Sequence, residues 1–156
     1  MLQRLQKELR DINKNPNKYF SVSPTSNFSV WNATILGPEK TFYENHIYHL
    51  YINIPQNYPF IAPTIKFAQP CYHPNVSTSG IICLDILNKK WSPIQNISST
   101  LLSIISFLSD PNTESPLNPD AAKVYRANLI AYHNNVQKVY SKADPKFFKD
   151  FPTLVS

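Results

Sequence analysis

Residues 73–93, with the sequence HPNVSTSGIICLDILNKKWSP, decide the fold because they separate a group of predicted strands from a group of predicted helices. They belong to a longer segment, residues 69–97, that shows neither the period of a helix nor that of a strand. A loop of this length within a small domain is either functional or disordered. Because the segment is rich in apolar and aromatic side chains, we expect an ordered loop with a functional role.

The residues before this loop predict strands. Residues 28–36 are rich in β-branched and aromatic side chains, residues 46–54 alternate between two faces, and residues 64–67 form a short third run. In the second run, Tyr48, Leu50 and Ile52 share one face. Short strands joined by turns favour an antiparallel meander.

Residues 1–15 predict an amphipathic helix with two stripes on opposite faces. The apolar stripe comprises Leu2, Leu5, Leu9 and Ile12, and the basic stripe comprises Arg4, Lys7, Arg10 and Lys14. Pro16 should end the helix. The basic stripe has two interpretations, a solvated face or a docking surface for an acidic groove on another protein.

Helices dominate the chain after the loop. Ser98 or Ser99 should cap a helix that runs to about Ser109, and because this helix is apolar almost all round we expect it to be central and buried. A second helix should start at Asn118-Pro119, and residues 129–142 predict a third. This order of elements predicts an α+β fold, with a core domain at residues 1–144 and a short C-terminal extension at residues 145–156. For the phenylalanines of the extension we favour packing or disorder over a docking motif.

Composition narrows the class of function. The chain has 156 residues, a net charge of +5 and a pI of about 9.2, which is compatible with nucleic-acid binding. The positive charge concentrates on the first helix, however, so we expect no nucleic-acid partner. The apolar runs are far shorter than the ~20 residues that cross a bilayer, and the first residues lack a signal-like run. We therefore expect a protein of the cytoplasm, the nucleus or both, without a membrane partner.

Two cysteines, Cys71 and Cys83, are candidates for a disulfide, a metal site or a nucleophile. A disulfide is not expected in a reducing compartment. The spacing of Cys71, His73 and Cys83 matches no common zinc site, so we expect no metal. A lone cysteine is usually a small buried hydrophobe, and we adopt this interpretation for Cys71.

The chain resembles the ubiquitin-conjugating enzymes over residues 3–142. The motifs that carry the resemblance are His73-Pro74-Asn75, residues 80–87 (GIICLDIL), Trp91-Ser92-Pro93, Tyr58-Pro59-Phe60, Asp110-Pro111-Asn112 and residues 115–118 (SPLN). It implies an α+β fold with an N-terminal helix, a four-stranded antiparallel meander sheet, a long ordered active-site loop, a central buried helix and C-terminal helices. Residues 70–76 further resemble the branch of the family that serves the anaphase-promoting ligase.

The resemblance makes Cys83 the catalytic nucleophile that carries ubiquitin as a thioester. A thiolate is a good nucleophile and a good leaving group, so a cysteine can accept an acyl group and pass it on. Asn75 is implied to stabilise the oxyanion or to order the loop, and a turn at Ser79-Gly80 should fold the chain back to bring Asn75 and Cys83 together. His73 and Pro74 are implied to hold the shape of the loop.

Two further residues concern the incoming lysine, whose ammonium must lose a proton near pH 7 against a reference pKa of about 10.4. The family often has an acid at the position of Ser115, and a serine can only hydrogen-bond the lysine. Asp85 is a nearby acid that can orient or deprotonate it. Desolvation of the lysine ammonium in the complex with the loaded enzyme is another way to favour loss of its proton.

The resemblance also implies partners: ubiquitin, the activating enzyme, a RING- or HECT-type ligase and substrate proteins, for a monomer that needs no cofactor. One surface would serve the activating enzyme and the ligase, and it comprises Gln3, Arg4, Lys7, Phe60, Ser92, Pro93 and Ile94. Leu102 would either contact the donor modifier or pack in the core. Two alternatives stay open, another ubiquitin-like modifier and a non-catalytic variant of the fold, and the presence of Cys83 disfavours the second.

Overall fold

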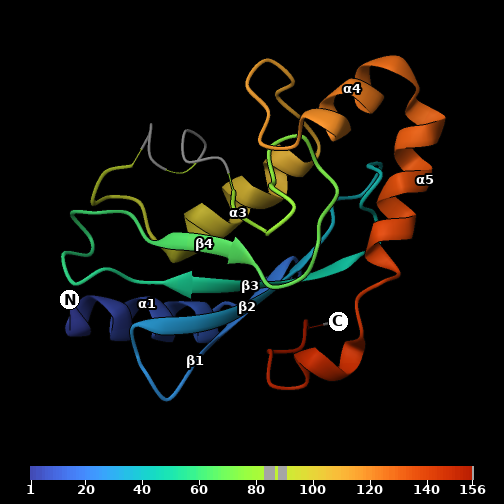
Figure 1. Ribbon diagram of the computed structural model, residues 1–156. Coiled ribbons are helices and arrows are strands. Elements are labelled where there is room, and N and C mark those ends of the chain that lie inside the picture. Colours follow the sequence, from blue (N-terminus) through green and yellow to red (C-terminus); the bar gives the residue numbers. More distant parts are fainter. Residues whose placement is uncertain (83–86, 88–90, 156) are drawn as a thin grey trace.

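The structure is a computed structural model that describes residues 1–82, 87 and 91–155. Its elements follow the predicted order of helix, strands, loop and helices, so the α+β fold is confirmed (Figure 1). The elements are α1 (Leu2–Lys14), β1 (Phe20–Pro24), β2 (Val30–Leu36), β3 (Ile47–Asn53), β4 (Thr64–Phe67), α3 (Ile97–Leu108), α4 (Pro119–Ala127), α5 (Leu129–Tyr140) and the 3-10 helix η1 (Pro145–Phe148). Within the described residues, no helix is both long and apolar enough to span a bilayer.

The strands form one antiparallel sheet in the order β1-β2-β3-β4, which confirms the meander. Alternation along β3 places Tyr48, Leu50 and Ile52 in the core, each no more than 1% exposed. The opposite face, which we call the outer face, carries Thr34 of β2 directly beside His49 of β3. The sheet therefore has one face against the helical layer and one face turned away from it.

Helix α1 lies within one residue of its predicted bounds, and its apolar stripe packs against the core except at Leu2. Leu5 is fully buried, as the apolar stripe predicts, whereas Leu2 is 54% exposed. Glu8 is buried instead, so a carboxylate lies within the apolar face. A buried charge must have partners, because its desolvation costs several kcal/mol. The partners of Glu8 are described with the candidate site.

Helix α3 begins earlier than predicted. Its N-cap is Asn96, whose side chain accepts a hydrogen bond from the Ser99 amide, while the Ser99 hydroxyl accepts one from the Asn96 amide. This reciprocal capping box places the two predicted caps, Ser98 and Ser99, inside the helix. Leu101 is fully buried, but Leu102 is 42% exposed, so the helix is not buried all round.

Helices α4 and α5 are capped by asparagines and anchored to the sheet through aromatic side chains. Asn118 caps α4 ahead of a proline, as predicted. At the other end of this pair, α5 ends at Tyr140, two residues before the predicted end. The Tyr140 ring lies parallel to that of His46, with centroids 3.9 Å apart. Helix α4 also contacts the 110–118 segment, because Nη1 of Arg126 donates to the carbonyl of Thr113 at 3.0 Å.

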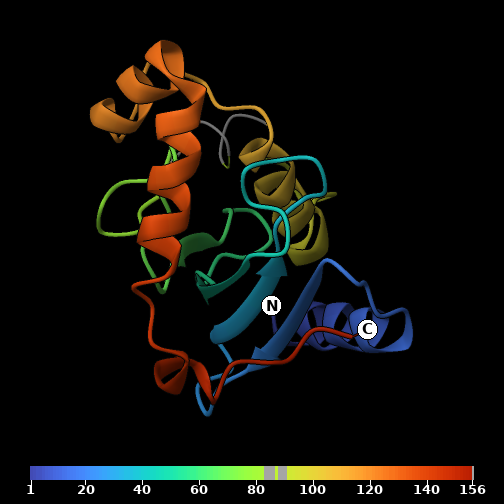
Figure 2. The ribbon, with the colours of Figure 1, turned by 90° about the vertical axis from the view of Figure 1, so that its right-hand side faces the viewer.

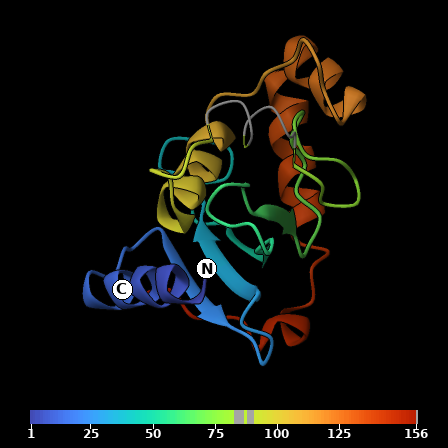
Figure 3. The same cartoon turned by 90° about the vertical axis from the view of Figure 1, so that its left-hand side faces the viewer.

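The C-terminal extension packs on the outer face of the sheet. Figures 2 and 3 show it passing below the sheet, on the side away from α3. The Thr34 hydroxyl donates a 2.6 Å hydrogen bond to the carbonyl of Pro152. The ring of His49 lies parallel to that of Phe148 at 4.2 Å and edge-on to Phe151 at 5.0 Å. Packing is therefore confirmed for Phe148 and Phe151, whereas Phe147 is 79% exposed. The packed extension explains why the outward-facing Thr34 is only 2% exposed.

Candidate active site

The long loop folds back on itself at the predicted turn. The Gly80 amide donates to the carbonyl of Ser77 at 3.0 Å, and Val76 then pairs with Ile82 in an isolated β-bridge. Gly80 has a φ of +90°, and a Cβ there would lie 2.4 Å from the carbonyl oxygen of Phe67. Both observations require glycine at this position. The turn brings Ile82, the residue before Cys83, beside the residue that follows Asn75.

His73 fastens the loop to α3. Its ring is fully buried, Nε2 donates to the carbonyl of Phe107 at 3.1 Å, and Nδ1 accepts from the Asn75 amide at 3.0 Å. Burial lowers the pKa of His73 from its usual 6.5 to about 3, against the opposite effect of the bond to Phe107. The imidazole is therefore neutral at pH 7 with its proton on Nε2. These contacts support the structural role implied for His73.

Asn75 joins the loop to the segment that follows α3. Its side chain is 2% exposed, donates to the carbonyl of Asn112 and accepts from the Asn112 amide, both at 2.8 Å. Next to it, the carbonyl of Pro74 accepts from the amides of Leu117 and Asn118 at 2.9 and 3.0 Å. We call this set of four hydrogen bonds the Asn75 clamp. It fixes the 110–118 segment against the residues that lead to Cys83.

Of the other predicted catalytic residues, the structure describes Ser115. Cys83 and Asp85 lie outside the described residues. Ser115 is exposed on the segment held by the Asn75 clamp. Cys71 is buried, and burial raises the pKa of its thiol, so it stays protonated at pH 7. Cys71 is therefore a core residue, as the sequence indicated.

The predicted docking residues come from three segments, and those on α1 and at residues 93–94 meet at one groove. The groove has a volume of about 390 Å³, and Arg4, Lys7, Pro93 and Ile94 are among its lining residues. Phe60 is 77% exposed, on a loop that accepts a hydrogen bond from Trp91 at the carbonyl of Pro59. Gln3 is exposed on α1 and Ser92 is partly buried, and neither lines the groove.

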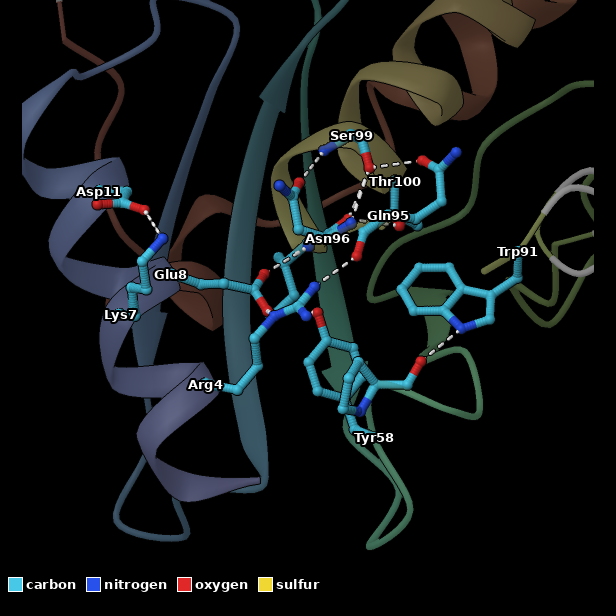
Figure 4. Close-up of polar contacts among 12 residues, drawn as sticks. Arg4, Lys7, Glu8, Asp11, Tyr58, Trp91, Gln95, Asn96, Ser99 and Thr100 are labelled. Atoms are coloured by element: carbon cyan, nitrogen blue, oxygen red, sulfur yellow. Dashed lines mark hydrogen bonds and ion pairs between the residues drawn. The ribbon is translucent and has the colours of Figure 1, made fainter. Parts of the chain in front are cut away.

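Glu8 is the residue of this region that the sequence pattern missed. One carboxylate oxygen, Oε2, accepts from Nε of Arg4 at 2.9 Å and from the hydroxyl of Tyr58, and the other, Oε1, accepts from the amide of Ile97 at 2.8 Å (Figure 4). Arg4 also donates from Nη2 to the carbonyl of Gln95 at 2.7 Å. The arrangement links α1, the 55–60 loop and the start of α3.

These contacts change the interpretation of the basic stripe. Arg4 pairs with Glu8, and Lys7 pairs with Asp11 at 3.4 Å through side chains that are 70% and 62% exposed. Half of the stripe is thus already paired with acids on the same helix. A partner would meet oriented hydrogen-bond donors here rather than a uniform positive surface.

Comparisons with known proteins agree with the fold. The family model of the ubiquitin-conjugating enzymes matches residues 4–140. The crystal structure of a Plasmodium yoelii protein assigned as a ubiquitin-conjugating enzyme is 40% identical and superposes with a TM-score of 0.84. The match covers 90% of this chain and 92% of that one. The comparisons leave the branch that serves the anaphase-promoting ligase as a prediction. On the length of the match and the shared fold, the chain belongs to the ubiquitin-conjugating enzyme family.

Proposed function

We propose that this chain accepts ubiquitin from the activating enzyme as a thioester on Cys83 and transfers it to a substrate lysine or to a ligase. The observation that carries the proposal is the Asn75 clamp, because it fixes the backbone at residues 74–75, and the next residue, Val76, pairs with Ile82, the residue before Cys83. The family match supports the reaction class. We expect this activity in the cytoplasm or the nucleus, where a thiol stays reduced.

The proposed chemistry is two acyl transfers. In the first, the Cys83 thiolate attacks the thioester carbonyl presented by the activating enzyme, a new C–S bond forms, and the thiolate of the activating enzyme leaves. In the second, a neutral lysine amine attacks, the C–S bond breaks and an amide forms. The attacking nitrogen gives up one proton to solvent, and the Cys83 thiolate is regenerated.

Asn75 is proposed to act chiefly by ordering the loop. Its amide nitrogen has two N–H groups, and one of them is committed to the carbonyl of Asn112. Stabilising the oxyanion would use the second N–H, so the two implied roles are compatible. The exposed hydroxyl of Ser115 is proposed to hydrogen-bond the incoming lysine.

Asp85 is proposed to orient or deprotonate that lysine. Asp85→Ala should slow discharge of the loaded enzyme to free lysine while leaving the loading of Cys83 unchanged. Single-turnover discharge of purified thioester measures the second transfer apart from loading. An unchanged discharge rate would remove Asp85 from the mechanism.

A loading assay tests the function directly. The chain is mixed with activating enzyme, ATP and ubiquitin, and we expect an adduct that reducing agent removes. Cys83→Ala should abolish the adduct, and Cys71→Ala is the matched control that should keep it. An adduct with another ubiquitin-like protein but not with ubiquitin would identify that protein as the modifier. No adduct with any modifier would favour the non-catalytic variant of the fold.

A further inference from the structure

Arg4 is held in one orientation although it lies at the surface. Its side chain is 30% exposed, yet Nε is bonded to Glu8 and Nη2 to the carbonyl of Gln95. The guanidinium also lies over the ring of Tyr58, 5.7 Å from its centroid. A guanidinium has five N–H donors, and these contacts use two of them. Within the described residues, Nη1 makes no hydrogen bond, so this side of the fork remains for a partner.

Glu8 is what fixes this orientation. A free arginine side chain has many rotamers, and a partner that binds it must overcome the entropy lost when one of them is selected. The Glu8 carboxylate is itself fixed by Tyr58 and by the amide of Ile97, so it does not move with Arg4. The Glu8 carboxylate is therefore held rigidly by the protein core, and it holds the Arg4 guanidinium where solvent can reach it.

The same contacts tie Arg4 to the rest of the docking surface. The carbonyl of Gln95 lies next in sequence to Ile94, which is 87% exposed and lines the groove with Pro93. The Ile97 amide belongs to the first turn of α3, directly after that segment. One carboxylate thus sets the position of α1 relative to the 93–96 segment.

We propose that Glu8 is a positioning residue for docking of the activating enzyme, holding the Arg4 fork beside Pro93 and Ile94 so that it meets a carbonyl or carboxylate of that partner. This inference rests on the proposed function. Glu8 does not touch the partner in this scheme and acts through Arg4. It is a role in binding rather than in the chemistry at Cys83.

Glu8→Gln is the sharpest test because it keeps the size of the side chain. A glutamine has one acceptor oxygen in place of two, so either the Ile97 amide or the Arg4 Nε loses its acceptor and meets an N–H donor. We expect the KM for the chain in the loading reaction to rise about 2- to 12-fold, the range that corresponds to ordering one rotamer-rich side chain on binding. The kcat of loading and the discharge of purified thioester to free lysine should stay unchanged.

Glu39→Gln is the matched control. Glu39 forms an exposed pair with Lys18 at 4.0 Å, away from the groove, so the same chemical change there should leave KM unaltered. Circular dichroism at the assay temperature verifies that each variant is folded.

A double variant separates positioning from general loosening. If Glu8 acts through Arg4, then Glu8→Gln adds nothing to the KM of an Arg4→Ala chain. Equal KM values for the natural chain and Glu8→Gln would overturn the proposal. It would also be overturned if Glu8→Gln raised the KM of the Arg4→Ala chain by the same factor as it raises the KM of the natural chain. Failure of the natural chain to load at all would instead overturn the proposed function.

Discussion

Mild acid should destabilise this protein through His73. Its ring is fully buried and neutral, with a folded-state pKa of about 3, whereas the unfolded chain takes up a proton with a pKa of about 6.5. Because the folded-state pKa is the lower one, the stability from His73 is present above pH 6.5 and is lost as the pH falls toward about 3. The loss approaches about 1.4 kcal/mol per pH unit.

The magnitude follows from proton linkage. Between pH 7 and pH 5 the free energy of unfolding should fall by about 2 kcal/mol on account of this one ring. The figure depends little on the folded-state pKa, since any value below about 4 leaves His73 neutral at pH 5 in the folded protein.

The assay is urea unfolding of the natural chain and of His73→Asn at pH 7, 6 and 5. The variant should be less stable at pH 7, and its deficit should shrink by about 2 kcal/mol by pH 5 because only the natural chain loses this term. Burial also lowers the pKa of His46 and His49, but both proteins contain them, so they cancel in the comparison. A deficit that stays constant with pH would mean that His73 protonates within the fold, and the reasoning would be wrong.

Three other substitutions test the loop and the extension by urea unfolding. Asn75→Ala removes two 2.8 Å hydrogen bonds and should cost about 1–3 kcal/mol, and unaltered stability would contradict the clamp. Gly80→Ala should cost more than about 3 kcal/mol, because strain at a positive φ adds to the clash with Phe67, and a loss below about 1 kcal/mol would show that the turn relaxes. Phe148→Ala should cost about 1–2 kcal/mol, whereas Phe147→Ala, at a 79% exposed position, should stay within about 0.5 kcal/mol, and equal losses would argue against packing on His49.

Local pattern predicted the elements whose signal is contained in their own residues. The alternation of Tyr48, Leu50 and Ile52 determines which face of β3 is buried, because a strand has a period of two. Strand β1, with the sequence FSVSP, carries a weaker form of this signal, because Phe20 and Val22 alternate with serines over only four residues before a proline, and only the family resemblance implied it. The turn at Gly80 was likewise predictable from glycine in a polar stretch.

Features that depend on distant partners were not predictable in this way. Glu8 interrupts an apolar face. The Tyr58 hydroxyl and the Ile97 amide, which come from other segments, donate the hydrogen bonds that offset the desolvation of its carboxylate. The cap of α3 was misplaced because both Asn96 and the serines after it are good caps, and the choice is made by the reciprocal bond between Asn96 and Ser99. The exposure of Leu102 depends on which other segments cover α3, and the sequence of α3 alone does not reveal them.

The packing of the extension on the outer face has a consequence for biosynthesis. The bond between Thr34 and Pro152 joins residues separated by 118 positions in the chain. A ribosome makes β2 early, and domains tend to fold from the N-terminal side as they emerge. The outer face of the nascent sheet therefore stays uncovered until residues 145–155 have been translated. During that interval His49 and Thr34 are open to solvent, whereas in the finished protein the extension covers them.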